Sequence, residues 1–190
     1  MTREGRTPSI GNPAREVRLP PIEPVREIVG RLEAAGIACA LGGSGLLAAL
    51  GLWDRVRDWD LTTDAPVDHL PALLEGGSFE RFGPSGVHAD SKLVIAAAGV
   101  DLIAEFALRA GDAVCRLPTI VTRRWNGLPL GSPEVWAVAY TLLERPAKAE
   151  RLFDHLARAG ADEAARALLD REPLPDDLRQ RLAEVPRREE

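Results

Sequence analysis

The stretch Leu41-Gly42-Gly43-Ser44-Gly45, followed by Asp58-Trp59-Asp60-Leu61, decides the fold expected of this chain. An apolar run over 37–41 predicts a short strand that leads into the glycine-rich turn. In the second segment two aspartates alternate with two apolar residues, as in a strand with one acidic and one apolar face. The two carboxylates would then project together from Cα atoms about 6–7 Å apart. Because like charges repel, such a pair is typical of a site for a hard divalent cation.

These residues resemble the motif of the nucleotidyltransferase superfamily related to DNA polymerase β, which includes small antibiotic and minimal nucleotidyltransferases. In that family a Gly-Gly-Ser turn precedes Asp-x-Asp on the next strand, and a third carboxylate follows on a later strand. The matching residues are Gly42-Gly43-Ser44, Asp58-Trp59-Asp60 and Asp101 within Val100-Asp101-Leu102-Ile103. The resemblance covers residues 25–110. It implies an α/β (α+β) fold with a mixed β-sheet flanked by helices.

The resemblance also implies a reaction, the Mg²⁺-dependent transfer of a nucleoside monophosphate from an NTP to an acceptor hydroxyl, with release of pyrophosphate. Asp58 and Asp60 would coordinate Mg²⁺ in a two-metal site, which clamps the attacking and leaving oxygens of an in-line displacement. Asp101 would be the third metal ligand and would orient or deprotonate the acceptor. The residues expected to bind the nucleotide are Gly42, Gly43, Ser44 and Lys148.

Two other functions fit parts of the sequence. Residues 43–48 match G-x-G-x-x-A, the dinucleotide fingerprint, and Asp64 lies where a ribose-binding acid is expected. The strand-rich pattern after residue 77 argues against such a dinucleotide-binding oxidoreductase. The second alternative is a catalytically silent nucleotidyltransferase-like module that binds a partner through its helical tail. The presence of all three aspartates argues against this alternative.

The remaining pattern predicts a flexible arm over residues 1–20, an α/β core over 21–131 and a helical segment over 132–190. Pro24, Asn126-Gly127 and Ser132-Pro133 indicate a helix start, a hairpin turn and a second helix start. Helices are expected over 24–35, 44–50, 67–74, 133–144, 147–159, 161–170 and 174–184. Strands are expected over 37–41, 58–63, 86–89, 92–98, 100–108, 112–117, 120–125 and 128–130.

Several other polar and aromatic residues are weaker candidates. Glu105 could assist Asp101, because it lies four residues further along the same expected strand face. Lys92 and Arg81 could neutralise triphosphate charge. His88 is expected to be structural, and Asp64 to cap a turn. The four tryptophans are expected in the core or at a rim, and Trp53 and Trp125 could flank a pocket.

Composition narrows the class of protein and of acceptor. The 190 residues carry a formal net charge of −5, which disfavours a general basic surface for nucleic acid. Small-molecule, protein and RNA acceptors all stay open, with the acidic charge favouring the first two.

The two cysteines, Cys39 and Cys115, lie in apolar runs and are expected to be buried thiols. No apolar run reaches the ~18 residues that span a bilayer, so we expect a cytoplasmic protein without membrane association.

Overall fold

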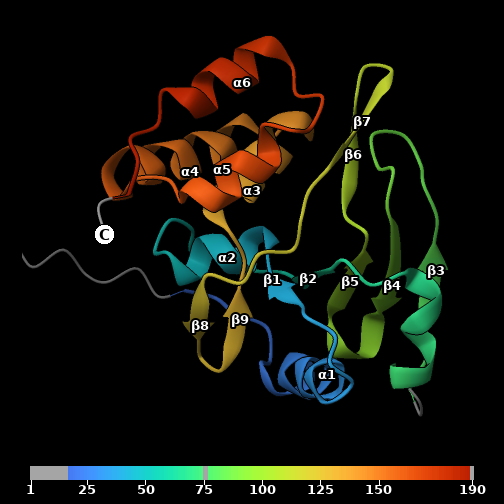
Figure 1. The fold of residues 1–190 in the computed structure, drawn as a ribbon. Helices are drawn as coiled ribbons and strands as arrows, with labels where there is room; N and C mark the ends of the chain where they lie inside the picture. Colours follow the sequence, from blue (N-terminus) through green and yellow to red (C-terminus); the bar gives the residue numbers. More distant parts are fainter. Residues whose placement is uncertain (1–16, 75–76, 189–190) are drawn as a thin grey trace, which may run out of the picture.

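The computed structural model describes residues 17–74 and 77–188, and its architecture is a mixed sheet covered by helices (Figure 1). In the seven-stranded sheet β2 pairs in parallel with β5, and β1 pairs in parallel with β9; the other neighbours are antiparallel. The strand order is β3 (Glu80–Phe82), β4 (Ser91–Ile95), β5 (Val100–Ala104), β2 (Trp59–Thr63), β1 (Ala40–Leu41), β9 (Leu128–Leu130) and β8 (Arg123–Trp125).

The antiparallel pairing of β1 with β2 excludes the dinucleotide-binding alternative. A strand, a helix and a strand in a doubly wound fold form a parallel pair with a crossover helix. Here the chain passes from β1 through α2 (Gly43–Ala49) into an antiparallel neighbour. The sheet is therefore mixed, as the resemblance implies.

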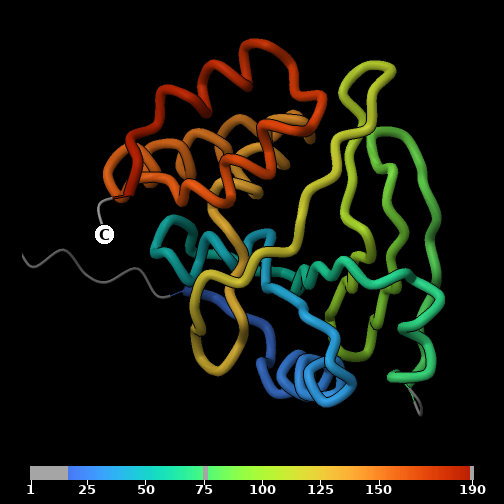
Figure 2. The backbone as a smooth tube through the Cα atoms, in the orientation of Figure 1, coloured from blue at the N-terminus to red at the C-terminus, as the bar shows by residue number. Residues whose placement is uncertain are grey.

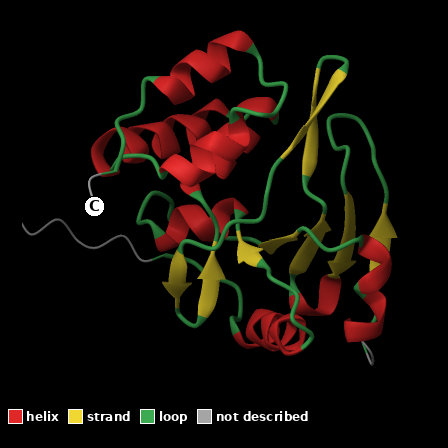
Figure 3. Ribbon diagram, in the orientation of Figure 1, coloured by secondary structure: helices red, strands yellow, loops and turns green. Residues whose placement is uncertain are grey.

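Figures 1 and 3 show helices at opposite ends of the molecule, with α2 between them. One group contains α3–α6, and α1 lies at the other end. A small separate sheet of β6 (Ala107–Ala110) and β7 (Ala113–Arg116) forms a hairpin that extends beside α3–α6 (Figure 2). The helix bounds are α1 Glu23–Ala34, α3 Pro133–Leu142, α4 Pro146–Ala159, α5 Glu163–Leu169 and α6 Asp176–Ala183, with 3₁₀ helices at Val67–His69, Pro71–Leu74 and Ala96–Ala98.

Helix α1 forms where apolar residues recur at helical spacing. Val25, Ile28, Val29 and Leu32 are all buried, so the helix presents one apolar stripe to the sheet. The helix ends before Gly36, whose φ of +73° is a left-handed conformation that favours glycine.

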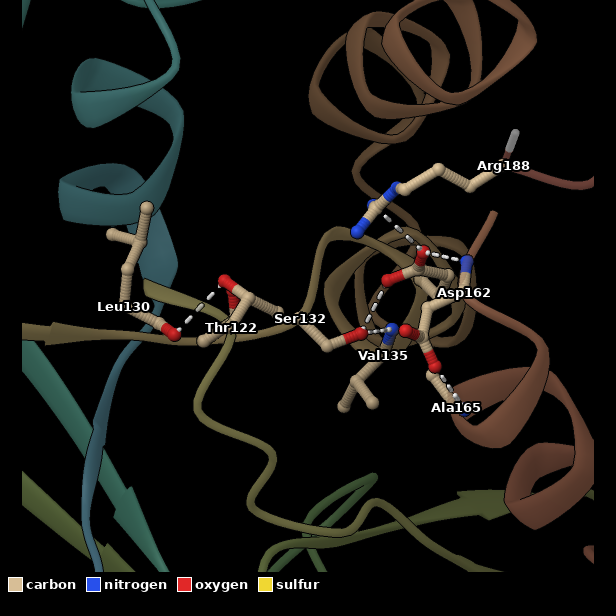
Figure 4. Close-up of polar contacts among 9 residues, drawn as sticks. Thr122, Leu130, Ser132, Val135, Asp162, Ala165 and Arg188 are labelled. Atoms are coloured by element: carbon tan, nitrogen blue, oxygen red, sulfur yellow. Dashed lines mark hydrogen bonds and ion pairs between the residues drawn. The ribbon is translucent and has the colours of Figure 1, made fainter. Parts of the chain in front are cut away.

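Helix α3 is the central element of the helical group, since every residue from Pro133 to Tyr140 is buried. Its first turn is fixed by polar contacts that Figure 4 shows. The Ser132 hydroxyl accepts the Val135 N–H at 3.2 Å and donates to the buried Glu134 carboxylate at 2.5 Å. Glu134 also accepts the Asp162 N–H at 2.8 Å and lies 3.8 Å from Arg188. One buried carboxylate thus ties α3 to the start of α5 and to the C-terminal segment.

The expected elements are confirmed along most of the chain, with errors concentrated in residues 67–108. The expected strand 100–108 is wrong because it breaks at Glu105, whose φ is +51°, and the chain then enters the second sheet. Residues 86–89 form a turn with isolated bridges, residues 96–98 a 3₁₀ helix, and 67–74 two 3₁₀ helices. Strand β3 was not expected, because all three of its residues are exposed at the sheet edge.

The structure also bears on the expected N-terminal arm and the two expected buried thiols. Residues 1–16 of the expected flexible arm lie outside the described residues, and Arg18 exchanges backbone hydrogen bonds with Asp54 and Val56. Cys39 and Cys115 are buried free thiols, as expected. In the described part of the chain, no helix combines the length and apolar character that crossing a membrane requires.

Candidate functional site

A pocket of about 480 Å³ opens where the sheet meets α3 and α4. Its wall contains five of the seven residues that the sequence predicts for the site: Ser44, Asp58, Asp60, Asp101 and Lys148. The other lining residues are Trp53, Arg55, Arg57, His88, Asp90, Lys92, Ile103, Phe106, Trp136, Tyr140, Leu143 and Arg145. Residues that lie more than 100 positions apart in the sequence therefore share one cavity.

The sheet places the three aspartates side by side. Asp60 on β2 is paired in register with Asp101 on the adjacent parallel strand β5, so their Cα atoms lie about 4.8 Å apart. Asp58 comes just before β2, which begins at Trp59 rather than at Asp58 as expected. The intervening Trp59 and the following Leu61 are fully buried on the opposite face. The alternation in the sequence thus separates an acidic pocket face from an apolar core face.

Asp60 is the most strongly perturbed carboxyl group of this acidic face. Burial raises its pKa to about 7, and the negative charges of Asp58 and Asp101 add to this shift. The ammonium groups of Lys148 and Lys92 act in the opposite direction. Among the described residues neither Asp58 nor Asp60 has a basic side chain within ion-pair distance. Their negative charge is therefore only partly compensated.

The glycine turn packs directly behind these carboxylates. A Cβ atom on Gly43 would lie 1.7 Å from Asp60 Oδ2, and the φ of Gly43 is +56°. A Cβ atom on Gly42 would lie 1.9 Å from Trp136 Cζ2. Both overlaps are far inside van der Waals contact, so only glycine fits at either position. The turn thereby brings Ser44 to the pocket wall.

Lys148 projects from α4 between two aromatic rings. Its Nζ lies 3.5 Å from the Tyr140 hydroxyl, 5.0 Å from the Tyr140 ring centroid and 5.6 Å from that of Trp53. Burial lowers the pKa of Lys148, and the positive charge of Arg145 adds to this effect, whereas Asp60 opposes it. Burial also raises the pKa of Tyr140. The aromatic pair thus holds the lysine within electrostatic range of the aspartates.

Three arginines of the pocket were missed at the sequence level. Arg55 and Arg57 flank the buried Val56, an alternation that could have indicated two basic side chains just before the aspartates. Arg145 precedes the first turn of α4. No local pattern marks it, because its position in the pocket depends on how α4 packs.

Two further polar pairs line the pocket near β4. Lys92 Nζ lies 2.6 Å from Asp101 Oδ2, and His88 Nδ1 lies 3.4 Å from Asp90 Oδ1. Asp90 is buried, its Oδ2 has no hydrogen-bond partner among the described residues, and burial raises its pKa, whereas the contact with His88 opposes this. The histidine expected to be structural therefore also reaches the pocket.

Other candidates lie elsewhere. Glu105 and Asp64 line a separate pocket beside β7 and α5, and Asp64 Oδ1 accepts the Thr119 N–H at 2.9 Å. Arg81 forms an ion pair with Asp68 on the exposed surface, and the ring centroids of Trp125 and Trp59 lie 6.5 Å apart. Glu105 cannot assist Asp101, because its left-handed backbone conformation turns the chain out of β5.

The acidic face is not a ready-made cage of three ligands. Within residues 17–74 and 77–188, no group of three His, Cys, Asp or Glu side chains stands close enough to hold a metal ion. Asp58 and Asp60 offer the hard oxygen ligands that Mg²⁺ prefers.

Comparison with known proteins rests on structure alone. No family model and no curated protein sequence matches this chain. A proposed nucleotidyltransferase of Thermotoga maritima (TM1012), whose crystal structure is known, is similar with a TM-score of 0.53 and 23% identity, over 72% of this chain and 92% of its own. The antibiotic-resistance factor ANT(2'')-Ia is similar with a TM-score of 0.51 and 17% identity, over 85% of this chain and 92% of its own.

These likenesses show that the chain shares its fold, a mixed β-sheet flanked by helices, with these two proteins. The resemblance inferred from the Gly-Gly-Ser turn and the Asp-x-Asp segment is thereby confirmed at the level of fold.

Proposed function

We propose that this protein is a metal-dependent nucleotidyltransferase that moves a nucleoside monophosphate from an NTP to an acceptor hydroxyl. The observation that carries the proposal is the register of Asp60 with Asp101 on adjacent strands, facing a pocket whose other wall carries Lys148 and Arg145. Negative groups on one wall suit a divalent cation, and positive groups on the other suit a triphosphate. The nucleotidyltransferase fold of the structural neighbours supports the same reaction class.

The residues of the acidic face fit a divalent cation. Asp60 lies beside two other carboxylates, and burial raises its pKa to about 7, with the charges of Asp58 and Asp101 adding to the shift. A divalent cation bound by these carboxylate oxygens would offset the repulsion between their negative charges. Asp58 and Asp60 would hold Mg²⁺, with Asp101 as the third carboxylate of the site. The bound metal would supply charge stabilisation at the reacting phosphoryl group.

The chain's own residues would then divide the remaining work. In the reaction the acceptor oxygen forms a bond to the α-phosphorus, the bond from that phosphorus to the β-phosphate oxygen breaks, and pyrophosphate leaves. Ser44, Lys148 and the three arginines would hold the triphosphate and balance the charge of the leaving group. Asp101 would orient the acceptor hydroxyl and accept its proton. Gly42 and Gly43 would keep Ser44 and Asp60 in place.

The acceptor is proposed only as a class. The acidic wall and the net charge of −5 favour a small molecule or a protein over a nucleic acid. The likeness to an antibiotic-resistance factor makes small polar molecules the first acceptors to screen.

Calorimetric titration of the full chain with each NTP, with and without Mg²⁺, tests the proposal. We expect Mg²⁺-dependent binding of at least one NTP, which the double variant Asp58→Ala/Asp60→Ala loses. Asp64→Asn is the matched control, because this carboxylate lies just after β2 but outside the pocket. Pyrophosphate release in the presence of an acceptor panel would then establish turnover.

Failure to bind any NTP would overturn the proposal and favour the catalytically silent module. Binding that persists in the double variant would show that the aspartates do not hold the nucleotide's metal.

A further inference from the structure

The face of the sheet that lines the pocket carries three charges in a row across three strands. Asp60 on β2 and Asp101 on β5 are paired in register. Lys92 lies on β4, the next strand, where it pairs with Ile103, two residues beyond Asp101 on the same face. Asp101 therefore has a carboxylate on one side and an ammonium group on the other.

The contact between Lys92 and Asp101 is short and supported. Their Nζ and Oδ2 atoms are 2.6 Å apart, and the carboxylate side chain is only 18% exposed. Phe82, the register partner of Lys92 on β3, places its ring centroid 5.9 Å from the same Nζ. A cation over an aromatic ring is attracted to it, so Phe82 helps to hold the lysine over the sheet.

Nearby positive charge is therefore distributed unevenly among the three aspartates of the site. Asp101 has a full positive charge at hydrogen-bond distance, while Asp58 and Asp60 have none within ion-pair distance among the described residues. This division agrees with the lack of a three-ligand cluster in the described part of the chain.

We propose that Lys92 replaces one of the two metal ions of a two-metal site, so that this protein holds a single divalent cation, at Asp58 and Asp60. A lysine ammonium group is a compact point charge that can stand beside a carboxylate where a cation would otherwise bind. Lys92 supplies that charge at Asp101 permanently. The inference rests on the proposed function, and it deepens it by assigning the cation requirement of the site.

The count of bound Mn²⁺ ions per chain tests this assignment. The full-length protein is titrated with Mn²⁺, alone and with a non-hydrolysable analogue of the NTP that calorimetry identifies, and free Mn²⁺ is followed by electron paramagnetic resonance. We expect one ion per chain in the wild type under both conditions, and two in Lys92→Met with the analogue. Methionine keeps the length of the apolar stem and removes only the charge.

Arg81→Met is the matched control, because it removes a positive charge from the neighbouring strand β3 without touching Asp101. It should leave the count at one, and circular dichroism confirms that each variant is folded. Two ions in the wild type, no ion in the wild type, or one ion in Lys92→Met would each overturn the inference.

The result is separable from the proposed function. A wild type that binds NTP through Asp58 and Asp60 but holds two Mn²⁺ ions keeps the function and loses the role of Lys92. A wild type that binds neither Mn²⁺ nor NTP loses both.

Discussion

The two walls of the pocket differ in charge and in how tightly they are built. The sheet wall carries Asp60 and Asp101, which strand register holds side by side in front of the glycine turn, and Asp58 just before β2. The basic wall carries Lys148 on α4 and Arg145 just before α4, and Arg55 and Arg57 line the same pocket from the segment just before Asp58. Lys148 is half-buried and the three arginines are exposed. The acidic wall is therefore fixed by strand pairing and a closely packed turn, whereas the basic side chains are more open to solvent.

The largest effect should follow from filling the space behind the acidic wall. In Gly43→Ala the new Cβ overlaps Asp60 Oδ2 and the residue is held at a positive φ. Strain and overlap together should lower the free energy of unfolding by about 3–4 kcal/mol. Urea denaturation followed by circular dichroism measures this loss, and the NTP titration should show that binding is lost as well.

Gly51→Ala is the matched control for that variant. Gly51 also has a positive φ, of +73°, but nothing lies within 4 Å of a Cβ placed there. In this variant backbone strain alone should lower the free energy of unfolding, by about 1–2 kcal/mol, and NTP binding should be kept. Equal losses in the two variants would mean that the contact with Asp60 does not constrain the turn.

The second prediction concerns the pH dependence of the acidic wall. The pKa of Asp60 is raised to about 7 in the folded chain from an ordinary value of 3.8. Between these two values the folded state binds more protons than the unfolded state, so the contribution of Asp60 to stability falls as pH rises from 4 to 7. Above pH 7 the destabilisation is fully present.

Asp60→Asn removes this penalty. Its free energy of unfolding relative to wild type should rise from pH 4 to pH 8 by on the order of 1–3 kcal/mol in metal-free buffer. Urea denaturation at pH 4, 6 and 8 measures the change. A constant difference across that range would show that Asp60 is ionised throughout.

The third prediction concerns the contribution of Lys148, on the basic wall, to NTP binding. Lys148→Met should weaken NTP binding about tenfold, or about 1.4 kcal/mol, because a charge that faces the phosphates is removed. Arg151→Met is the control, since Arg151 contacts the same Trp53 ring, at 5.4 Å, but does not line the pocket. Equal losses in the two variants would assign the effect to the packing around Trp53 and not to the charge facing the pocket.

The same contrast between the walls explains what the sequence could predict. Gly42, Gly43, Asp58 and Asp60 lie within 19 residues, and strand alternation and turn chemistry are local signals. The strand of Asp101 was also expected, although its end was not, because nothing in the sequence marks the left-handed conformation of Glu105.

The basic wall could not be predicted in the same way. Arg145 enters the pocket only because α3 is buried on all sides and α4 packs against it. Lys148 was named on the resemblance alone, and His88 was expected to be structural. Their positions depend on tertiary packing between segments that are far apart in sequence, which no short window encodes.

The smallest effect tests whether the helical group that carries the basic wall moves as one body. Asp162 caps α5 by accepting the Ala165 N–H at 2.9 Å, while its own N–H binds the buried Glu134 at the start of α3. Asp162→Ala removes the cap but keeps the backbone bond, so it should cost about 1 kcal/mol of stability. Because α5 does not line the pocket, NTP affinity should stay within twofold of wild type. A larger loss of affinity would show that the Glu134 contact transmits the strain of α5 to α3 and α4, and that the position of the basic wall depends on the whole helical group.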